Sequence, residues 1–542
     1  MPNRLTRWVD RNFLELGREM RLSYLPPLMV YMAAGVSGLT GLVGTFFVKE
    51  YLGLSATFLA ALGFWAGIPW ALKMPVGHLV DLLWRWKAGL VYLGAALIAS
   101  SIAIMIGLIG SPEAMRQVMG AERWFVISVL LAPIGYVMQD AVADAMTVEA
   151  VPRFEEDGTP VPEATRRLMN TTMQTLGRVA IIGGSVLVSV ANVVMFAGTE
   201  DLPQADKVGI YLDIYGMALV IPALSVAGVA WASWLRRRKR RSLVASGADA
   251  DTVAAFDRPG GDTLTRPNWW ILGGSLLFVV ITVAVGLSGL ENGQEIIFVG
   301  SFTVIAFLMS RLLRELDDNA RRTLLGTAIV IFVFRALPGP GAGSTWWMID
   351  DLGFDQSFLA KLSLIGASLT LAGLFLFRRM MAERSIAWIV IFLTLASTAL
   401  ALPIVGMYYG LHEWTAAHTA GVVDARFIAI FDTALESPLG QIAMVPMLAW
   451  IANSAPNHLK ATFFAVMASF TNLALSASQL GTKYLNQVFV VAREVRDPSS
   501  AAVSTPADYS ELGMLLLTVT AIGLLLPPVA IGLTRLAGLR SA

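Results

Sequence analysis

The sequence predicts an all-α polytopic membrane protein, and two observations lead to this fold class. Apolar residues make up 56% of the 542 residues and charged residues only 15%, whereas an average soluble domain is roughly 25% charged. Apolar runs of about 20 residues, the length needed to cross a bilayer, recur along the chain. This composition excludes a secreted disulfide scaffold, a disordered chain and a nucleic-acid-binding protein.

About 14 apolar segments are candidate transmembrane helices. They lie near residues 24–48, 56–81, 88–110, 124–149, 167–196, 210–235, 269–290, 294–313, 322–348, 357–379, 384–409, 426–453, 458–486 and 510–536. Lys and Arg concentrate in alternate connecting segments, beginning with the N-terminal one. Because cytoplasmic loops carry the excess of basic residues, we expect both termini in the cytoplasm. We expect the membrane to be a bacterial inner membrane.

The order of these segments divides the chain into five regions. They are a cytoplasmic leader at 1–23, an N-terminal six-helix bundle at 24–235, a cytoplasmic basic linker at 236–268, an inserted transmembrane hairpin at 269–313 and a C-terminal six-helix bundle at 322–542. The leader has apolar residues at helical spacing among arginines, which indicates an amphipathic helix on the inner leaflet; a plain cytoplasmic leader is the alternative. The hairpin has no ionisable residue near the centre of either helix, so we expect it to pack outside the twelve core helices. Six helices plus six is typical of transporters with two related halves.

The end of the second segment carries a candidate gate. Gly77 and Asp81 are followed by Arg85, and this spacing resembles the loop signature of the major facilitator superfamily. A glycine lets two helices approach closely, and an aspartate can pair with cations at the inner mouth in one state and release them in another. The alternative is a helix end followed by the basic residues of an ordinary cytoplasmic loop.

Four groups of residues resemble the folate–biopterin transporter family of this superfamily. They are Ile68-Pro69-Trp70-Ala71-Leu72-Lys73, Gln139-Asp140-Ala141-Val142-Ala143-Asp144-Ala145, Phe332-Val333-Phe334-Arg335 with Pro338, and Ala455-Pro456 with Ser469 and Asn472. They occur in order and cover both halves of the chain. The resemblance implies a major-facilitator-type fold of two six-helix bundles, a transport activity and a substrate of the folate or pterin type.

Cations inside the apolar segments are the candidate substrate-binding residues, because a charge within a membrane is costly and marks a function by default. These cations are Lys73, Arg178, Arg335 and Lys361. The folates implied by the resemblance carry carboxylates, so we predict that the cations bind an anionic substrate. Arg335 is the strongest candidate, because it lies at the centre of its segment. The Pro- and Gly-rich run at 338–343 must interrupt the helix beyond it, and unwound backbone at this depth is tolerated where it lines a cavity.

Acidic residues inside the segments are the candidate proton carriers. Asp140 and Asp144 are four residues apart and share one helix face, and Asp432 and Glu436 repeat this spacing. Two like charges held close in a medium of low dielectric constant favour proton uptake by one of them. The alternative is structural ion pairing, with Lys73 or Arg178 neutralising the first pair of acids.

Two further sets of residues leave their role open. Trp346 and Trp347 could stack on a flat heterocycle, or could belong to the aromatic belt at the outer membrane surface, which their place near a segment end favours. Asn472, Ser476 and Gln479 share one helix face. They could bind the edge of a pterin, or hold helices together.

No feature of the sequence predicts a metal site, a cofactor or an enzyme. There is no cysteine, and the four histidines are scattered along the chain. His412 and His418 lie close together in a predicted outer loop, where a pH-sensing or metal-binding role is open, but exposed histidines usually have neither role. Nucleotide-binding loops and hydrolase motifs are also missing from the sequence.

Two functions from different classes fit these observations. The first is a secondary active transporter that works by alternating access and couples an anionic small molecule to protons, with membrane lipids around it. The alternative is a non-transporting membrane assembly or lipid-handling factor on a major facilitator fold. The charges within the membrane favour the transporter, since an inert scaffold would not bear their cost. The hairpin and the leader favour the alternative, because both add surface for lipids or partners.

Overall fold

The computed structural model describes most of the chain. The described residues are 20–48, 52, 54–71, 73–83, 86–151, 161–199, 202, 204–245, 269–288, 290–314, 316–440, 442, 460–496 and 503–541. Most of the predicted leader and residues 246–268 of the predicted linker lie outside these ranges.

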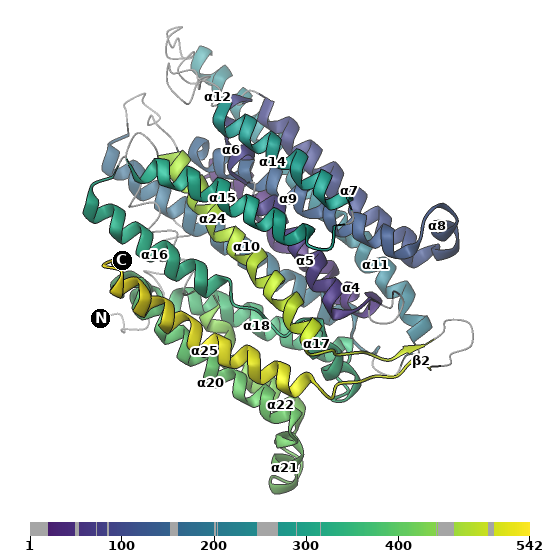
Figure 1. Ribbon diagram of the computed structural model, residues 1–542. Helices are drawn as coiled ribbons and strands as arrows, with labels where there is room; N and C mark the ends of the chain where they lie inside the picture. The colour runs from purple at the N-terminus through teal and green to yellow at the C-terminus, as the bar shows by residue number, and fades with distance from the viewer. Residues whose placement is uncertain are drawn as a thin grey trace, which may run out of the picture.

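All the described secondary-structure elements in the first half of the chain are helices (Figure 1). Its elements are η2 (Leu22–Tyr24), α3 (Leu25–Gly35), η3 (Val36–Thr40), α4 (Gly41–Phe47), α5 (Ala56–Ala71), α6 (Lys73–Leu82), α7 (Lys87–Gly110), α8 (Pro112–Val118), α9 (Ala121–Ala150), α10 (Glu163–Met195), η6 (Gln204–Lys207), α11 (Val208–Ala218) and α12 (Val220–Ala245).

The second half begins with a helical hairpin and ends with a long helix. Its elements are α14 (Trp269–Leu287), α15 (Gly293–Leu313), α16 (Asp318–Arg335), α17 (Ala342–Asp350), α18 (Gln356–Leu376), α19 (Arg378–Glu383), α20 (Ile386–Tyr408), α21 (Leu411–His418), α22 (Ala425–Glu436), η7 (Ser437–Leu439), α24 (Lys460–Val488), β1 (Val495–Arg496), β2 (Val503–Thr505) and α25 (Leu512–Leu536).

The helices support a multi-pass membrane protein. Among the described residues, 10 helices are long and apolar enough to cross a membrane, and α14 contains a shorter apolar helix at Leu272–Gly286. Every range predicted to span the membrane contains described helix, although several ranges are divided between two helices. The total of fourteen spans and the division into six, two and six stay predictions.

The structure differs from the sequence prediction at two places. The helix α12 continues through the basic run to Ala245, past the predicted boundary at residue 235, because Arg and Lys are good helix formers. A small antiparallel strand pair, with Val495 opposite Thr505 and Arg496 opposite Val503, lies between α24 and α25. The prediction of an all-α chain therefore omits one short β element.

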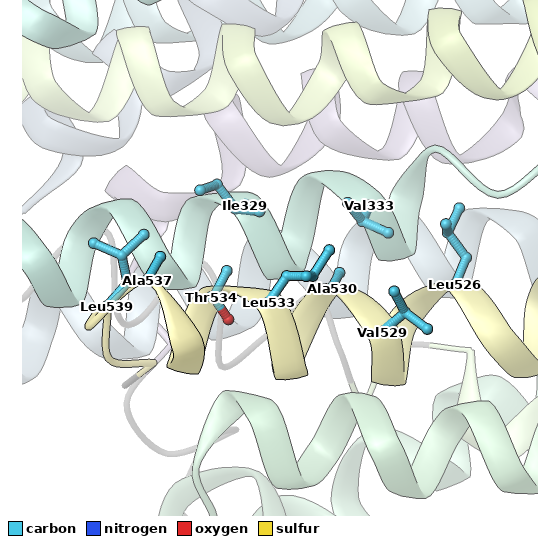
Figure 2. Close-up of a pocket in the computed structure, with 9 residues that line it drawn as sticks. All are labelled: Ile329, Val333, Leu526, Val529, Ala530, Leu533, Thr534, Ala537 and Leu539. Carbon is cyan, nitrogen blue, oxygen red and sulfur yellow. The ribbon is translucent and has the colours of Figure 1, made fainter.

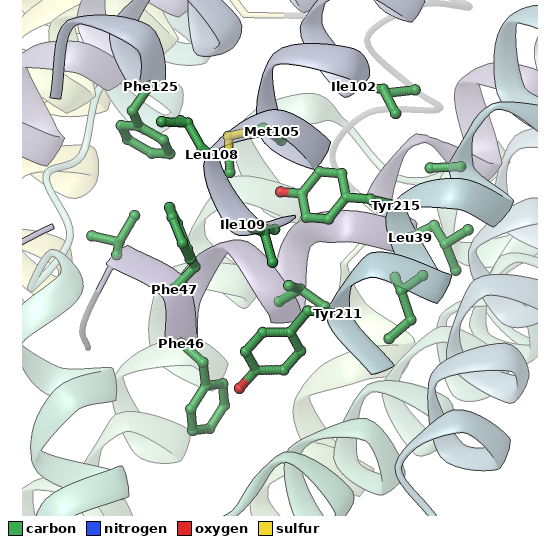
Figure 3. Close-up of a cluster of buried hydrophobic side chains, with 14 of the residues drawn as sticks. Leu39, Phe46, Phe47, Ile102, Met105, Leu108, Ile109, Phe125, Tyr211 and Tyr215 are labelled. Atoms are coloured by element: carbon green, nitrogen blue, oxygen red, sulfur yellow. The ribbon is translucent and has the colours of Figure 1, made fainter. Parts of the chain in front are cut away.

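Buried apolar clusters hold each half together. Figure 3 shows one in the first half, to which α4 contributes Phe47, α7 Leu108, α9 Phe125 and α11 Tyr211. The surface is apolar as well. On α14, Leu276 is 67% exposed, as expected for a side chain that faces hydrocarbon.

The two halves meet along two helix pairs in the middle of the molecule. The most extensive contacts between halves join α5 to α24 and α10 to α18, and Figure 1 shows these helices between the outer ones. Any site shared by the two halves must therefore draw on these four helices and the ends of their neighbours.

The α14–α15 hairpin lies against both halves. Gln294 donates a hydrogen bond to the carbonyl of Ala61 in α5 (3.2 Å), and Glu295 pairs with Lys483 of α24 (3.1 Å). Tyr484 of α24 also donates to Glu295. The hairpin therefore lies across the α5–α24 contact and is bound to both helices at the same end.

Candidate transport site

Lys73 binds two carboxylates inside the first half. Its Nζ lies 2.5 Å from Oδ2 of Asp140 and 2.8 Å from Oδ2 of Asp144. The side chains of Lys73 and Asp140 are each 17% exposed. The structure therefore shows the ion pairing that the sequence left open as the alternative role of Asp140 and Asp144, with Lys73 as the cation. One ammonium among two carboxylates leaves the cluster with an excess negative charge.

Tyr31 completes this cluster, and sequence reasoning missed it. Its hydroxyl donates a hydrogen bond of 2.6 Å to Oδ1 of Asp144, and the side chain is 5% exposed. Gly177 of α10 has no side chain where Tyr31 packs, since a Cβ there would lie 2.9 Å from the tyrosine ring. A tyrosine in an apolar segment resembles any core residue, so only the fold identifies this partner.

Other polar residues of α9 hold helices together. Gln139 is buried and accepts a hydrogen bond from Ser225 of α12 (2.8 Å). Glu149 pairs with Lys87 of α7 (2.5 Å) and accepts two hydrogen bonds from Arg236 of α12. The motif therefore combines a charged cluster with structural contacts at the end of α9.

Two arginines, one from each half, lie close enough for their charges to interact. Arg178 lies near the middle of α10, and Arg335 is the last residue of α16. Arg178 is close enough to act on Arg335 and also on Asp140. Among the described residues, neither arginine forms an ion pair with a carboxylate. Two cations without a paired acid are an arrangement that an anion would stabilise.

Among the described residues, Arg335 forms no ion pair with Asp432 or Glu436. Arg335 instead donates from Nε to the carbonyl of Thr471 in α24 (3.2 Å). Asp432 is buried, and its Oδ1 has no hydrogen-bond partner there. Glu436 is exposed, and so is the candidate cation Lys361 of α18.

The helix break after Arg335 is confirmed, but its backbone groups are paired with α24. Residues 336–341 separate α16 from α17, and Gly341 has a φ of 76°. Ser478 donates to the carbonyl of Leu337 (2.6 Å), and Thr482 accepts from the N–H of Gly339 (2.9 Å). Unwound backbone within a membrane is also tolerated where protein buries it, and this explains the break without a cavity.

A second face of α24 packs against α5. Asn472 donates a hydrogen bond to the carbonyl of Trp70 (3.1 Å). Ser476 packs on Gly67, and a Cβ added to Gly67 would lie 2.9 Å from the Oγ of Ser476. Gln479 lies in the same way on Gly63. These contacts are those of close helix packing through small residues, so in this state the three polar side chains hold the two halves together.

Trp346 and Trp347 are buried in the second half, at 1% and 3% exposure. The interpretation as an aromatic belt at the membrane surface is therefore wrong, because belt residues face the interface. They pack with Leu512 and Leu515 of α25. The guanidinium of Arg493 lies over the Trp346 ring, 5.2 Å from its centre.

Buried polar contacts join the halves at one end of the molecule, the end predicted to face outward. Arg493, 3% exposed, donates to the carbonyl of Val48 beyond α4 (2.5 Å). Lys207 donates to Gln356 of α18 (3.2 Å), and Gln356 donates to the hydroxyl of Tyr211 (3.1 Å). Hydrogen bonds therefore join the two halves at this end.

The remaining candidates are placed only in part. Gly77 lies within α6, and a Cβ there would meet no atom within 4 Å. The side chain of Asp81 and all of Arg85 lie outside the described residues, so the gate is untested. His418 contacts the Trp414 carbonyl (2.8 Å) within α21. No group of three or more metal-binding side chains occurs among the described residues.

Comparison with known proteins gives a partial family match and the fold. The model of the BT1 family matches residues 278–537. A folate–biopterin transporter from Synechocystis sp. is 20% identical over 462 residues, which cover 85% of this chain and 74% of the relative.

Two solved transporters share the fold. One is a POT family transporter in complex with 5-aminolevulinic acid (TM-score 0.53, 12% identity), which covers 96% of each chain. The other is a variant of the nucleoside transporter NupG (TM-score 0.52, 11% identity), which covers 94% of this chain and 98% of NupG. The family and these neighbours are transporters and not enzymes. The family match and the Synechocystis relative agree with the resemblance found in the motifs, so the chain is similar to the BT1 family and to a folate–biopterin transporter.

Proposed function

We propose that the protein is a proton-coupled secondary transporter that moves an organic anion of the folate or pterin type by alternating access. The observation that carries this proposal is the pair Arg178 and Arg335, one from each half, with no carboxylate in an ion pair with either among the described residues. An anion bound between them would neutralise both. Guanidinium groups suit this role because they bind a carboxylate with two parallel hydrogen bonds.

Proton coupling follows from the neighbouring cluster of Lys73, Asp140 and Asp144. A proton on this cluster would remove its excess negative charge. Asp140 also interacts electrostatically with Arg178. Protonation of Asp140 would remove the negative charge that partly offsets the charge of Arg178, so Arg178 would attract an anion more strongly. The proton and the anion would therefore favour each other's binding, which is the requirement for symport.

Alternating access is supported by where the halves touch. In this state hydrogen bonds between the halves close the predicted outer end, and glycines of α5 bring α24 close. Transport requires these contacts to part while each half stays folded. The distribution of basic residues supports a cytoplasmic location of both termini, and we propose a bacterial inner membrane as the location of the protein.

Uptake into proteoliposomes tests the proposal. We expect labelled folate or biopterin to accumulate when the lumen is alkaline relative to the outside, and accumulation to stop when a protonophore collapses the gradient. Arg335→Ala should abolish the uptake, while Arg426→Gln, at an exposed arginine outside the cluster, should preserve it. If neither compound accumulates and neither stabilises the protein, the substrate class is wrong. Uptake that ignores the gradient would disprove proton coupling alone.

A further inference from the structure

An apolar groove lies on the outside of the second half, away from the charged clusters. Figure 2 shows it between α16 and α25, with a volume of about 300 Å³. Its lining includes Ile329, Val333, Leu526, Val529, Leu533 and Leu539. Val529 and Leu533 are 51% and 61% exposed, so the groove opens away from the bundle. In a membrane, hydrocarbon chains surround such a surface.

The groove has the length of one leaflet. It extends from Leu526, near the middle of α25, to Leu539 just beyond the end of that helix. At 1.5 Å per helical residue this is roughly 20 Å, compared with about 15 Å for half of the hydrocarbon core. A single acyl chain entering from the C-terminal end would therefore fit along it.

Two arginines lie at the C-terminal end of the groove. Arg540 follows the lining residue Leu539, and its backbone packs on Gly326 of α16, where a Cβ would lie 2.2 Å from the Arg540 carbonyl oxygen. Arg322 lies two turns before Ile329 on the same face of α16, because positions i and i+7 nearly align. Both arginines are exposed.

The two acids that the structure describes near this end, Asp317 and Asp318, already have partners. Asp317 accepts a hydrogen bond from the N–H of Ala320 as the cap of α16 (2.7 Å), and Asp318 pairs with Arg321 (3.4 Å). The guanidinium of Arg540 donates a hydrogen bond to the neutral side chain of Asn319 (3.4 Å). The described residues thus leave the charges of Arg322 and Arg540 without a carboxylate. An apolar groove that ends at two such cations complements a lipid with a negative headgroup.

We propose that this groove binds one acyl chain of an anionic phospholipid, with the phosphate held by Arg322 and Arg540. The guanidinium groups supply paired hydrogen bonds to phosphate oxygens, and the groove excludes the chain from the bulk bilayer. The site is separate from the proposed transport site, so its occupancy should affect stability more than substrate selection.

The test is thermal unfolding of the full chain, stripped of lipid in a neutral detergent. Phosphatidylglycerol should raise the unfolding temperature, whereas phosphatidylcholine with the same chains should not. The double variant Arg322→Gln/Arg540→Gln should weaken the response roughly thirty-fold in lipid concentration, as expected for two cations at a lipid headgroup. Arg321→Gln is the matched control and should respond like the parent, because Arg321 pairs with Asp318.

A second pair of variants tests the groove. Ile329→Trp should fill the groove and reduce the response to phosphatidylglycerol, while Leu525→Trp, at an exposed position outside the lining, should preserve it. An equal response to phosphatidylcholine, or an unchanged response in the double arginine variant, would overturn the proposal. An equal response to glycerol phosphate would show that the site binds free phosphate and not a lipid, which also overturns it.

Discussion

The Nζ of Lys73 lies 2.5 Å from Oδ2 of Asp140, which joins the start of α6 to the middle of α9. Both side chains are largely buried, so their charges depend on each other. Removing one partner of a buried ion pair typically costs about 3–5 kcal/mol, whereas removing all the charges together costs much less.

We therefore expect Lys73→Met to lower the unfolding temperature sharply in detergent. The triple variant Lys73→Met/Asp140→Asn/Asp144→Asn should recover most of that loss, because no charge is left unpaired. Thermal unfolding followed by size-exclusion chromatography measures both. A triple variant no more stable than Lys73→Met would contradict the idea that the ion pair stabilises the first half.

Arg335 should be the residue whose loss most damages uptake while the fold stays intact. Arg335→Ala should abolish uptake, and Arg335→Lys should lose most of it while inserting normally, since an ammonium cannot reproduce a two-bond contact with a carboxylate. Its single described hydrogen bond, to the Thr471 carbonyl, is one that lysine can also make. Full uptake by purified Arg335→Ala would show that Arg335 is not a substrate ligand.

Glu436→Gln should weaken the dependence of uptake on the pH gradient more than it weakens apparent affinity for substrate. Glu436 is exposed at the end of α22, four residues after the buried Asp432, so it can exchange protons with water. Asp424→Asn, at the opposite end of the same helix, is the control. An unchanged response to the gradient in Glu436→Gln would remove it from the proton path.

Adjacent glycines of α10 should differ in their tolerance of a methyl group. A Cβ on Gly184 would lie 2.8 Å from backbone atoms of Gly35 in α3, whereas a Cβ on Gly183 would meet nothing within 4 Å. Overpacking costs about 1–3 kcal/mol, so Gly184→Ala should lower the unfolding temperature. Gly183→Ala should be neutral or stabilising, because alanine favours helix. Equal effects of the two substitutions would show that α3 and α10 are not packed this closely.

Linking the halves at the predicted outer end should stop uptake. The chain has no cysteine, so Lys207→Cys/Gln356→Cys can be joined by a bifunctional thiol reagent without background reaction. We expect uptake to cease after linking and to return after reduction. Ser101→Cys/Ser128→Cys, a pair within the first half whose hydroxyl oxygens lie 3.0 Å apart, should tolerate linking. Normal uptake with Lys207 and Gln356 linked would mean that this end does not need to open.

Parts of this structure could be predicted from the sequence, because helix spacing is local information. The apolar runs predicted where helices form, and ion pairing of Lys73 with Asp140 was one of the two roles that the sequence left open for these charges. The break after Arg335 followed from prolines, which cannot continue a helix. These inferences need only the depth of a residue along its own segment.

The failures involve the direction in which a side chain points. Trp346 and Trp347 lie near a segment end, but their side chains point into the second half. Tyr31 has no distinguishing pattern at all, although it donates to Asp144. Rotation of one helix against another is fixed by packing between distant segments, which one sequence does not reveal.

The two polar faces of α24 differ in how firmly they bind their neighbours, and this difference determines how the helix would move when the halves separate. Toward the second half, Ser478 and Thr482 are bonded to the interrupted backbone after Arg335, and these bonds fix α24 in register with α16 and α17. Toward the first half, the helix meets glycines of α5 with few hydrogen bonds. If the halves separate, the break should run along the glycine face, and α24 should travel with the second half as one rigid unit. The hairpin contacts Gln294–Ala61 and Glu295–Lys483 lie on opposite sides of that break, so one of them must yield each time the halves part.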